Sequence, residues 1–315
     1  MNILKKCNAI IIGLGKIGMI NGFDSKRIQP ASHVAAIIKN SNINLIGVCD
    51  INIEFTDIFK KKYPEIKNVF NSLDDLLEKI VSTNIKIDIF SIATPENVHF
   101  KIIELLLKKN QNASNKTIIF CEKPFTPDIA SAKKIKDLNK NSNIHIVVNH
   151  IRRWSKIWKE IKNVISEIGE IKNGTYILST TPENKNFSQI RDGIHIADVI
   201  SWLNIAEKMT IKRLNVPYHV YEFHLWGEKG KIELIASDQI LNFYKIKKSE
   251  RFEGFQELHL KSTKSIDESY FENAYDEFVN FLNTKSLTLS TNIDDAIIAM
   301  ETFERYVYDP RLDKK

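Results

Sequence analysis

The chain has 315 residues, of which 43% are hydrophobic and 27% charged, and its formal net charge at pH 7 is +6. This length allows about two domains, and the composition is that of a globular protein. No apolar run reaches the roughly 18 residues of a transmembrane helix, so a membrane is not predicted as a partner. The positive charge is mostly lysine spread along helical stretches, without a zinc-finger or RNA-binding motif, and nucleic acid is not predicted as a partner either.

The cysteines indicate the cellular compartment. There are three of them, so they cannot all pair, and Cys7, Cys49 and Cys121 each lie in or beside a predicted strand. Buried free thiols are therefore expected. Free thiols are typical of a reducing environment, which predicts a cytoplasmic protein.

The first half of the chain alternates short apolar runs with amphipathic stretches. The predicted strands are 9–13, 44–50, 87–94, 117–124 and 143–150, and the predicted helices are 53–62, 73–81, 97–109 and 127–140. Apolar strands separated by helices indicate a parallel sheet that is covered on both faces. The pattern predicts a doubly wound α/β domain of the Rossmann type over residues 1–150.

The second half has a different pattern, which predicts an α/β domain with an open, mainly antiparallel or mixed sheet over residues 151–315. A long amphipathic helix is predicted at 152–168, with Trp154, Trp158, Ile161 and Ile165 on the stripe that faces the core. The strand-like segments are 170–180, 209–216, 218–227, 231–237, 239–247 and 255–262, and two helices follow at 270–283 and 293–307. Several of these strands alternate apolar and polar residues, which is typical of a sheet with one solvated or partner-covered face.

The sequence GLGKIG at 13–18 directly follows the first apolar strand, as the dinucleotide-binding fingerprint requires. Gly13 permits a tight turn, Gly15 lets the backbone approach a pyrophosphate, and Gly18 allows close packing of the next helix. That helix would offer its N-terminal N–H groups to the phosphates. The residues predicted to bind the cofactor here are Gly13, Gly15, Lys16, Ile17 and Gly18; the alternative is a glycine-rich turn without a ligand.

Asp50 ends the second predicted strand. An acidic side chain at this position of a Rossmann domain can accept hydrogen bonds from the adenosine ribose hydroxyls, and its charge would repel a 2′-phosphate. The predicted cofactor is therefore NAD, with NADP still possible. The alternative is that Asp50 caps the helix at 52–62, and the two roles can coexist.

Two further strand ends fall on the carboxyl edge of the predicted sheet, where ligands bind in open α/β folds. One carries Thr94 and Pro95, with His99 four residues on, and the other carries Glu122, Lys123 and Pro124. A lysine at such a strand end can lose part of its hydration, which lowers its pKa, and it can then move a proton. The alternative for Lys123 is a surface lysine beside a turn.

In the second half, His195 and Asp198 are three residues apart in a predicted helix and so share one face. A carboxylate in this position can orient the imidazole ring and increase its basicity, although such a pair is also common in a purely structural role. No metal site is predicted, because the remaining histidines show no ligand spacing.

These motifs together resemble the Gfo/Idh/MocA family of nicotinamide-dependent oxidoreductases over essentially the whole chain. The resemblance rests on GLGKIG (13–18), CD (49–50), SIATPENVH (91–99), CEKPF (121–125), NHIRRW (149–154), GIHIADVISWL (193–203) and WGEKGKIEL (226–234). It implies that Lys123 and His195 are the catalytic residues beside the reacting hydroxyl. It also implies that Thr94, Pro95, Glu122 and Asn149 line the nicotinamide side of the cofactor, and that the protein forms a homodimer or homotetramer through the second sheet. His99 and Lys123 are predicted to bind the cofactor as well.

One position departs from the family pattern. Many sugar and cyclitol dehydrogenases of the family carry an Asp four residues before the histidine, where this chain has Arg191, with Asp192 one residue later. On a helix, one residue turns the side chain by about 100°, so Asp192 does not simply replace the missing carboxylate. An arginine can bind a carboxylate or a phosphate through two parallel hydrogen bonds. Arg153, Arg191 and Asp192 are therefore the predicted substrate-binding residues, and an anionic sugar, as a nucleotide sugar or a sugar acid, is the predicted substrate.

The predicted function is hydride transfer between a nicotinamide and a secondary alcohol or ketone of a sugar. One alternative is a redox-neutral, glycosidase-like enzyme that reduces and reoxidises NAD within each cycle. The other is a regulator that binds the cofactor without catalysis.

Overall fold

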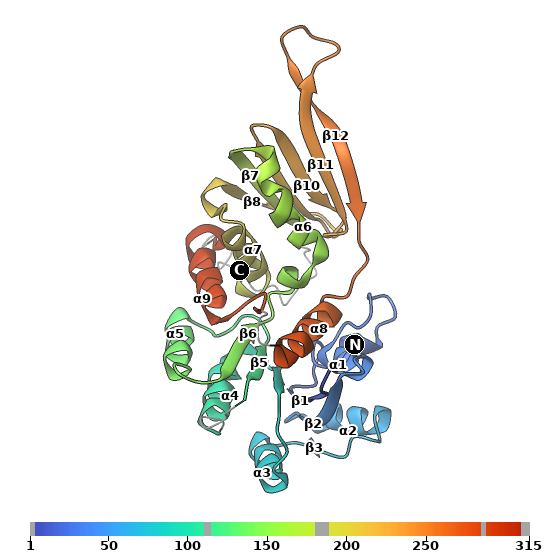
Figure 1. The fold of residues 1–315 in the computed structure, drawn as a ribbon, viewed down its shortest axis with the longest axis vertical. Helices are drawn as coiled ribbons and strands as arrows, with labels where there is room; N and C mark the ends of the chain where they lie inside the picture. The colour runs from blue at the N-terminus through green and yellow to red at the C-terminus, as the bar shows by residue number, and fades with distance from the viewer. Residues whose placement is uncertain (1–3, 110–114, 180–188, 285–287, 310–315) are drawn as a thin grey trace. The chain divides into compact units, whose positions relative to one another are not determined.

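The computed structural model describes residues 4–109, 115–179, 189–284 and 288–309. The chain forms two compact units (Figure 1). The first unit consists of Met1–Ile151 together with Ser269–Ile297, and the second of Arg152–Glu268 together with Ile298–Lys315. The first unit thus takes in a segment from far along the chain.

The first unit contains a six-stranded parallel sheet, as the continuous apolar runs predict. Its strands are β1 (Cys7–Ile12), β2 (Ile43–Cys49), β3 (Val69–Phe70), β4 (Ile89–Ile92), β5 (Thr117–Cys121) and β6 (Ile144–Val148). They lie in the order β3-β2-β1-β4-β5-β6, which is the doubly wound order of a dinucleotide-binding fold. The order reverses between β1 and β4, so the carboxyl ends of these two strands form the edge of the crevice in which such folds bind ligands. The predicted fold class is confirmed.

Helices connect these strands, and most of them begin at a polar capping residue. They are α1 (His33–Lys39), α2 (Ile53–Lys62), α3 (Leu73–Thr83), α4 (Glu96–Lys109) and α5 (Ile129–Leu138). The side chains of Ser32, Asn52, Ser72 and Asp128 each accept a hydrogen bond from a backbone N–H in the first turn of α1, α2, α3 and α5. These caps satisfy N–H groups that have no partner within the helix, and they define where each helix starts.

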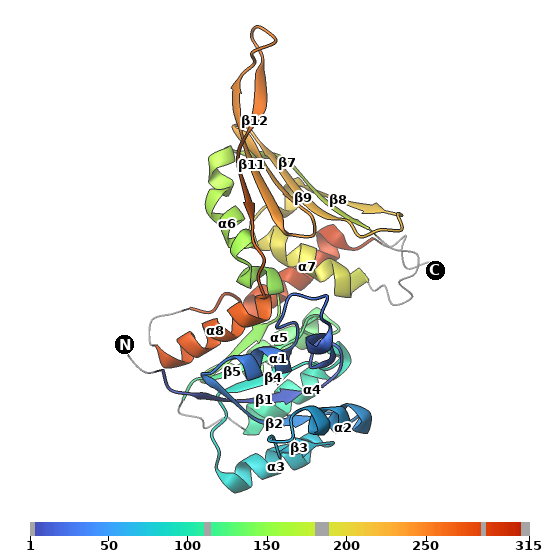
Figure 2. The same cartoon turned by 90° about the vertical axis from the view of Figure 1, so that its right-hand side faces the viewer.

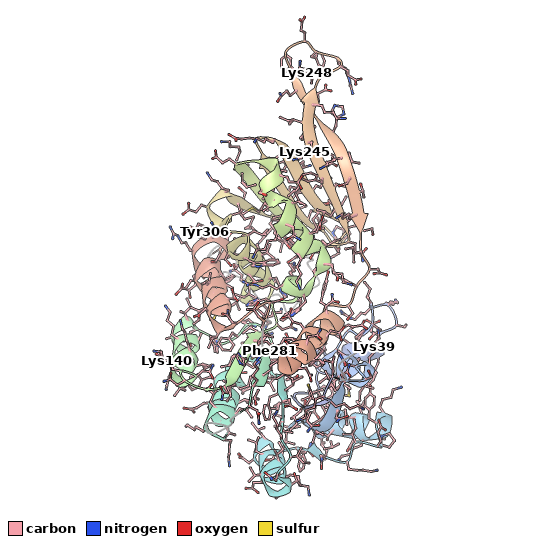
Figure 3. All side chains as sticks on the ribbon, in the orientation of Figure 1. Lys39, Lys140, Lys245, Lys248, Phe281 and Tyr306 are labelled. Carbon is pink, nitrogen blue, oxygen red and sulfur yellow. The ribbon has the colours of Figure 1, made fainter. Side chains whose placement is uncertain are left out.

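The helix α8 (Tyr270–Asn283) brings the later segment into the first unit, where it packs beside the parallel sheet (Figure 2). Its aromatic rings meet those of β5 edge to face, with Phe120 5.7 Å from Tyr275 and 4.8 Å from Phe278. Phe281, labelled in Figure 3, makes the same kind of contact with His145 of β6. The helix α8 is therefore part of the core of the first unit.

The second unit contains the predicted open sheet, which is mixed. Its strands are β7 (Ile171–Ser179), β8 (Met209–Leu214), β9 (Tyr221–Gly227), β10 (Gly230–Ile235), β11 (Ile240–Lys248) and β12 (Gln256–Ser265). They lie in the order β12-β11-β10-β9-β7-β8, with β7 and β8 parallel and the other pairs antiparallel. The hairpin of β11 and β12, with Lys248 near its tip, extends beyond the rest of this sheet (Figures 1 and 3).

One face of the second sheet packs against helices, as the alternating strands predict. Trp158 is fully buried and its ring lies 5.0 Å from that of Phe223 on β9. The predicted continuous helix over 152–168 is wrong in one respect, because Ser155 interrupts it. The Ser155 hydroxyl caps α6 (Lys156–Val164), and short 3₁₀ turns precede and follow that helix. The second unit also contains α7 (Gln189–Trp202) and, from Ile298 on, the second half of α9 (Ile293–Thr302).

The cysteines are free and buried, as predicted. Burial raises the pKa of Cys7 to about 11 and that of Cys49 to about 12, and it raises the pKa of Cys121 as well. Because the thiolate is the reactive form, these three groups are inert at neutral pH. Among the described residues, no helix is long and apolar enough to cross a membrane.

Candidate active site

The glycine motif forms the turn that joins β1 to the carboxyl edge of the parallel sheet. Gly13 has a φ of +100°, and a side chain there would place its Cβ 2.6 Å from the backbone carbonyl of Ala93, at the end of β4. A Cβ on Gly18 would lie 2.1 Å from the carbonyl oxygen of Gly13. Both contacts are with backbone that cannot move aside, so the fold itself requires glycine at these two positions.

Gly15 differs from its two neighbours in the motif. A Cβ built on this residue meets no described atom within 4 Å. Neither packing nor a left-handed backbone therefore explains a glycine at 15. A ligand that approaches the backbone closely does explain it, since this is the position that the fingerprint leaves bare for a pyrophosphate. The loop fits a dinucleotide.

The expectation that a regular helix starts at the glycine motif is wrong. The chain continues through successive turns, in which the N–H of Met19 donates to Gly15 and that of Asn21 donates to Lys16, and then through a 3₁₀ helix at Ile20–Phe23. The first α-helix, α1, starts only at His33. The intervening segment contains Gly22 and Pro30, which do not favour helix continuation. Phosphate contacts at this loop would therefore come from the N–H groups of turns, which can also form anion-binding concavities.

Asp50 lies directly after β2 and faces the glycine loop. One of its carboxylate oxygens accepts a hydrogen bond from the backbone N–H of Leu14 at 2.6 Å, and the other accepts one from Asn52 at 2.8 Å. The cap of α2 is Asn52, so the alternative that Asp50 caps this helix is wrong. Each oxygen keeps a further acceptor position. The arrangement therefore leaves Asp50 able to accept a hydroxyl hydrogen bond beside the glycine loop.

His99 joins the other two strand ends. Its ring is fully buried, with Nε2 2.8 Å from the carbonyl oxygen of Thr94, and with Nδ1 3.1 Å from the carbonyl oxygens of both Pro124 and Phe125. The ring nitrogens of His99 thus contact backbone of this chain. The residue holds the loop after β4 against the loop after β5, which carries Lys123.

Glu122 is the centre of a buried hydrogen-bond network. It is 6% exposed, and its Oε1 accepts from Asn149 at 2.5 Å and lies 3.0 Å from Nε2 of His33. Its Oε2 accepts from the backbone N–H of Lys123 at 3.2 Å. Burial on its own would raise the pKa of Glu122, but the hydrogen bonds from His33 and Asn149 and the charge of Lys123 outweigh it, so the pKa is lowered. The predicted residues Glu122, Lys123 and Asn149 are therefore brought together.

Two members of this network, His33 and Tyr275, are not predicted from the sequence. His33 lies behind an irregular loop, and Tyr275 is 242 residues further along the chain. Nδ1 of His33 is 2.8 Å from the Tyr275 hydroxyl, which is 2.7 Å from the hydroxyl of Ser91. No local pattern marks these residues, because α8 supplies the tyrosine through a long-range contact.

In the second unit, α7 carries the predicted residues of the histidine segment. Arg191 is exposed, and Asp192 and His195 are half-buried. A Cβ on Gly193 would lie 2.7 Å from the ring of Phe303, so a glycine permits this close packing. The helix that GIHIADVISWL predicts is confirmed.

The structure gives Asp198 a partner that the sequence analysis did not anticipate. Its Oδ1 is 2.9 Å from Nε and 2.8 Å from Nη2 of Arg153, and both residues are buried. Arg152 forms a similar buried ion pair with Asp238 at 3.0 Å. Arg153, one of the predicted substrate-binding residues, is thus balanced by a carboxylate within the protein. Among the described residues, no cluster of His, Cys, Asp and Glu could hold a metal ion.

Comparison with known proteins extends these observations. Residues 7–150 match the sequence model of an oxidoreductase family with an NAD-binding Rossmann fold, GFO_IDH_MocA. Residues 7–150 belong to the Gfo/Idh/MocA family. An uncharacterised oxidoreductase of Schizosaccharomyces pombe is 32% identical over 111 residues, which is 35% of this chain and 27% of that relative. The matched segment therefore spans about a quarter of the length of this relative.

Two solved structures share the fold of the chain. An oxidoreductase from Agrobacterium radiobacter, crystallised with NAD+, L-tartaric acid and magnesium, has a TM-score of 0.69 at 14% identity, over 95% of each chain. A 3-ketoreductase variant from Actinomadura kijaniata, crystallised with TDP-benzene and NADP, has a TM-score of 0.68 at 11% identity, over 95% of this chain and 96% of that one. At this identity, the likeness shows the α/β fold alone.

The glycine contacts lead to a prediction about stability. We expect Gly18→Ala to destabilise the protein by more than about 2 kcal/mol, since backbone atoms block the new methyl group. Gly15→Ala, at an open position, should change the unfolding free energy by less than about 0.5 kcal/mol. Urea unfolding followed by circular dichroism gives both values, and equal losses in the two variants would contradict the packing account.

Proposed function

We propose that the protein is an NAD-dependent oxidoreductase that acts on a secondary alcohol or ketone of a sugar. The observation that carries this proposal is the glycine loop of residues 13–18. Folding explains Gly13 and Gly18, whereas Gly15 is explained by a ligand that approaches the backbone. The family match over 7–150 supports a dinucleotide as that ligand.

The first unit supplies the groups that would hold the cofactor. The backbone of the glycine loop would face the pyrophosphate, and the loops after β4 and β5 would face the nicotinamide half. Asp50 would accept a hydrogen bond from an adenosine ribose hydroxyl, since both of its oxygens are already oriented by the N–H groups of Leu14 and Asn52. Its negative charge would disfavour a 2′-phosphate, so we propose NAD in preference to NADP.

When bound, the nicotinamide would accept or donate the hydride. The residues of this chain would manage the proton and orient the substrate. Lys123 is half-buried and directly follows Glu122, whose carboxylate fixes its backbone N–H. We assign Lys123 the role of taking the hydroxyl proton during oxidation and returning it during reduction. His195, on α7, is proposed to contact the substrate.

Replacement of the lysine tests this assignment. Lys123→Ala should lower kcat by about 100-fold or more, because general acid–base catalysis contributes about that much, while the affinity for NADH changes by less than about threefold. A matched control is Lys140→Ala, which removes an exposed lysine beyond the end of α5 (Figure 3). Steady-state kinetics and NADH titration measure both effects. Turnover that survives Lys123→Ala would overturn the assignment.

We also propose that the sugar is anionic, as a nucleotide sugar or a sugar acid. The proposal rests on Arg191, whose side chain is exposed at the start of α7. An exposed guanidinium can bind a phosphate or a carboxylate through two hydrogen bonds. The ligand of the Actinomadura kijaniata 3-ketoreductase, TDP-benzene, contains a nucleoside diphosphate and is consistent with this class.

An anionic sugar and its neutral analogue distinguish a role of Arg191 in anion binding from a general loss of activity. Arg191→Ala should raise the Michaelis constant for an anionic sugar by about tenfold or more, which is the loss of one charge-assisted contact. The Michaelis constant for a neutral analogue should change little. Arg305→Ala, at another exposed arginine, serves as the control. Equal changes for both substrates would reject the anionic class.

We further propose a cytoplasmic protein that forms a homodimer or homotetramer through the open face of the second sheet. The support is that Trp226, Leu258 and Leu260 of this sheet are 36%, 44% and 55% exposed. An exposed apolar patch of this kind is typical of an interaction surface. Light scattering that found only monomers at micromolar concentration would contradict the oligomer.

A further inference from the structure

A chain of polar side chains crosses the interior of the first unit. It runs from Ser91 on β4 to Tyr275 on α8, then to His33 at the start of α1, and ends at Glu122 after β5. The successive distances are 2.7, 2.8 and 3.0 Å. Ser91, Tyr275 and His33 are fully buried. Because buried polar groups are costly without partners, a complete chain of this kind in an apolar core needs an explanation.

The direction of each hydrogen bond follows from the acceptor at its end. An ionised carboxylate only accepts, so Nε2 of His33 must donate to Glu122. In the neutral ring Nδ1 is then an acceptor, so the Tyr275 hydroxyl donates to it and in turn accepts from Ser91. Each donor points toward Glu122, and each bond polarises the next. The hydrogen bonds of these side chains together therefore stabilise one buried negative charge, that of the Glu122 carboxylate.

The carboxylate of Glu122 links this chain to Lys123. Oε1 receives the hydrogen bonds of His33 and Asn149, and Oε2 receives the backbone N–H of Lys123. The turn that carries Lys123 is thus hydrogen-bonded to the Glu122 carboxylate, which His33 and Asn149 hold in place. His99 holds the same turn from its other side, through the carbonyl groups of Pro124 and Phe125.

We propose that His33, held in one tautomer by Tyr275 and Ser91, is a positioning residue for Lys123, because it keeps the Glu122 carboxylate ionised and fixed against the lysine turn. This inference rests on the proposed function of Lys123. The chain ends at a fully buried serine, so it does not carry protons to solvent. It acts by holding a charge in place.

The groups that face Glu122 within the first unit set its titration. They are His33 from α1, Lys123 and Cys121 from its own strand end, and Tyr275 from α8, with the uncharged Asn149 after β6. His33, Asn149 and Lys123 favour the carboxylate, whereas burial opposes it. Without the hydrogen bond from His33, the effect of burial outweighs the remaining interactions, and the pKa of Glu122 rises.

The test compares two replacements of His33 that differ in one donor. His33→Gln keeps an N–H group able to reach Glu122, and His33→Met fills similar space without a donor. Tyr275→Phe is a milder variant, because it removes only an oxygen and keeps the ring contacts with Phe120 and Phe278. Circular dichroism establishes that each variant is folded.

The first readout needs neither substrate nor cofactor. Carbon-13 NMR of the Glu122 carboxyl group, assigned with Glu122→Gln, follows its titration in the free protein. We expect the midpoint to rise by about two pH units or more in His33→Met, and by less than about one in His33→Gln and Tyr275→Phe. Equal midpoints in His33→Met and the unaltered protein would overturn the proposal.

The second readout is the pH profile of kcat. In His33→Met, kcat at pH 5 should fall about tenfold or more, while kcat at pH 8.5 stays within about threefold and NADH affinity is kept. A purely structural defect would lower kcat equally at both pH values, and that outcome would contradict positioning. If Lys123→Ala leaves turnover intact, the proposed function fails, whereas the NMR titration still reports on the His33–Glu122 interaction.

Discussion

The parallel sheet of the first unit imposes the constraint on which the candidate site depends. All six strands run in one direction, so their carboxyl ends, and the loops that follow them, gather at one edge. β1 delivers the glycine loop, β4 delivers Thr94, and β5 delivers Glu122 and Lys123 to that edge. The close approach of Gly13 to the Ala93 carbonyl shows how tightly two of these loops meet. Groups that are distant in sequence thereby become neighbours without any special local structure.

A second constraint comes from charge in the interior. Glu122 is buried, and a buried carboxylate persists only where donors surround it. The chain supplies His33 from α1 and Asn149 after β6, and α8 returns from the far part of the sequence with Tyr275. The first unit is thus completed by a helix that lies outside residues 7–150, the segment matched by the family. In the second unit, the buried carboxylates of Asp198 and Asp238 likewise have charged donors, Arg153 and Arg152.

Local patterns in the sequence predict much of this arrangement. The apolar runs indicate the parallel sheet because strands buried on both faces need continuous apolar residues. The glycine spacing predicts the turn at Gly13 and the close packing at Gly18, since both follow from local backbone geometry. Residues 21–33, which lengthen the separation between the glycines and Asp50, have the composition of a loop before the next helix, and α1 indeed starts only at His33.

Contacts between distant residues set the limit of such prediction. The spacing of His195 and Asp198 is compatible with a pair, but a buried arginine from another helix competes for the carboxylate. His99 has the polar character expected near a cofactor, yet its nitrogens meet backbone carbonyls that only the folded loops bring close. Tyr275 has no local signal, because its partners lie on α1 and β4.

Calorimetric titration of the purified protein with NADH and NADPH tests the central claim most directly, namely that the glycine loop and Asp50 form an NAD site. The account predicts saturable binding of one NADH per chain, with NADPH at least about tenfold weaker because the Asp50 carboxylate opposes a 2′-phosphate. Equal or tighter binding of NADPH would contradict the role of Asp50. A folded, cofactor-free protein that bound neither nucleotide would contradict the account of the site as a whole.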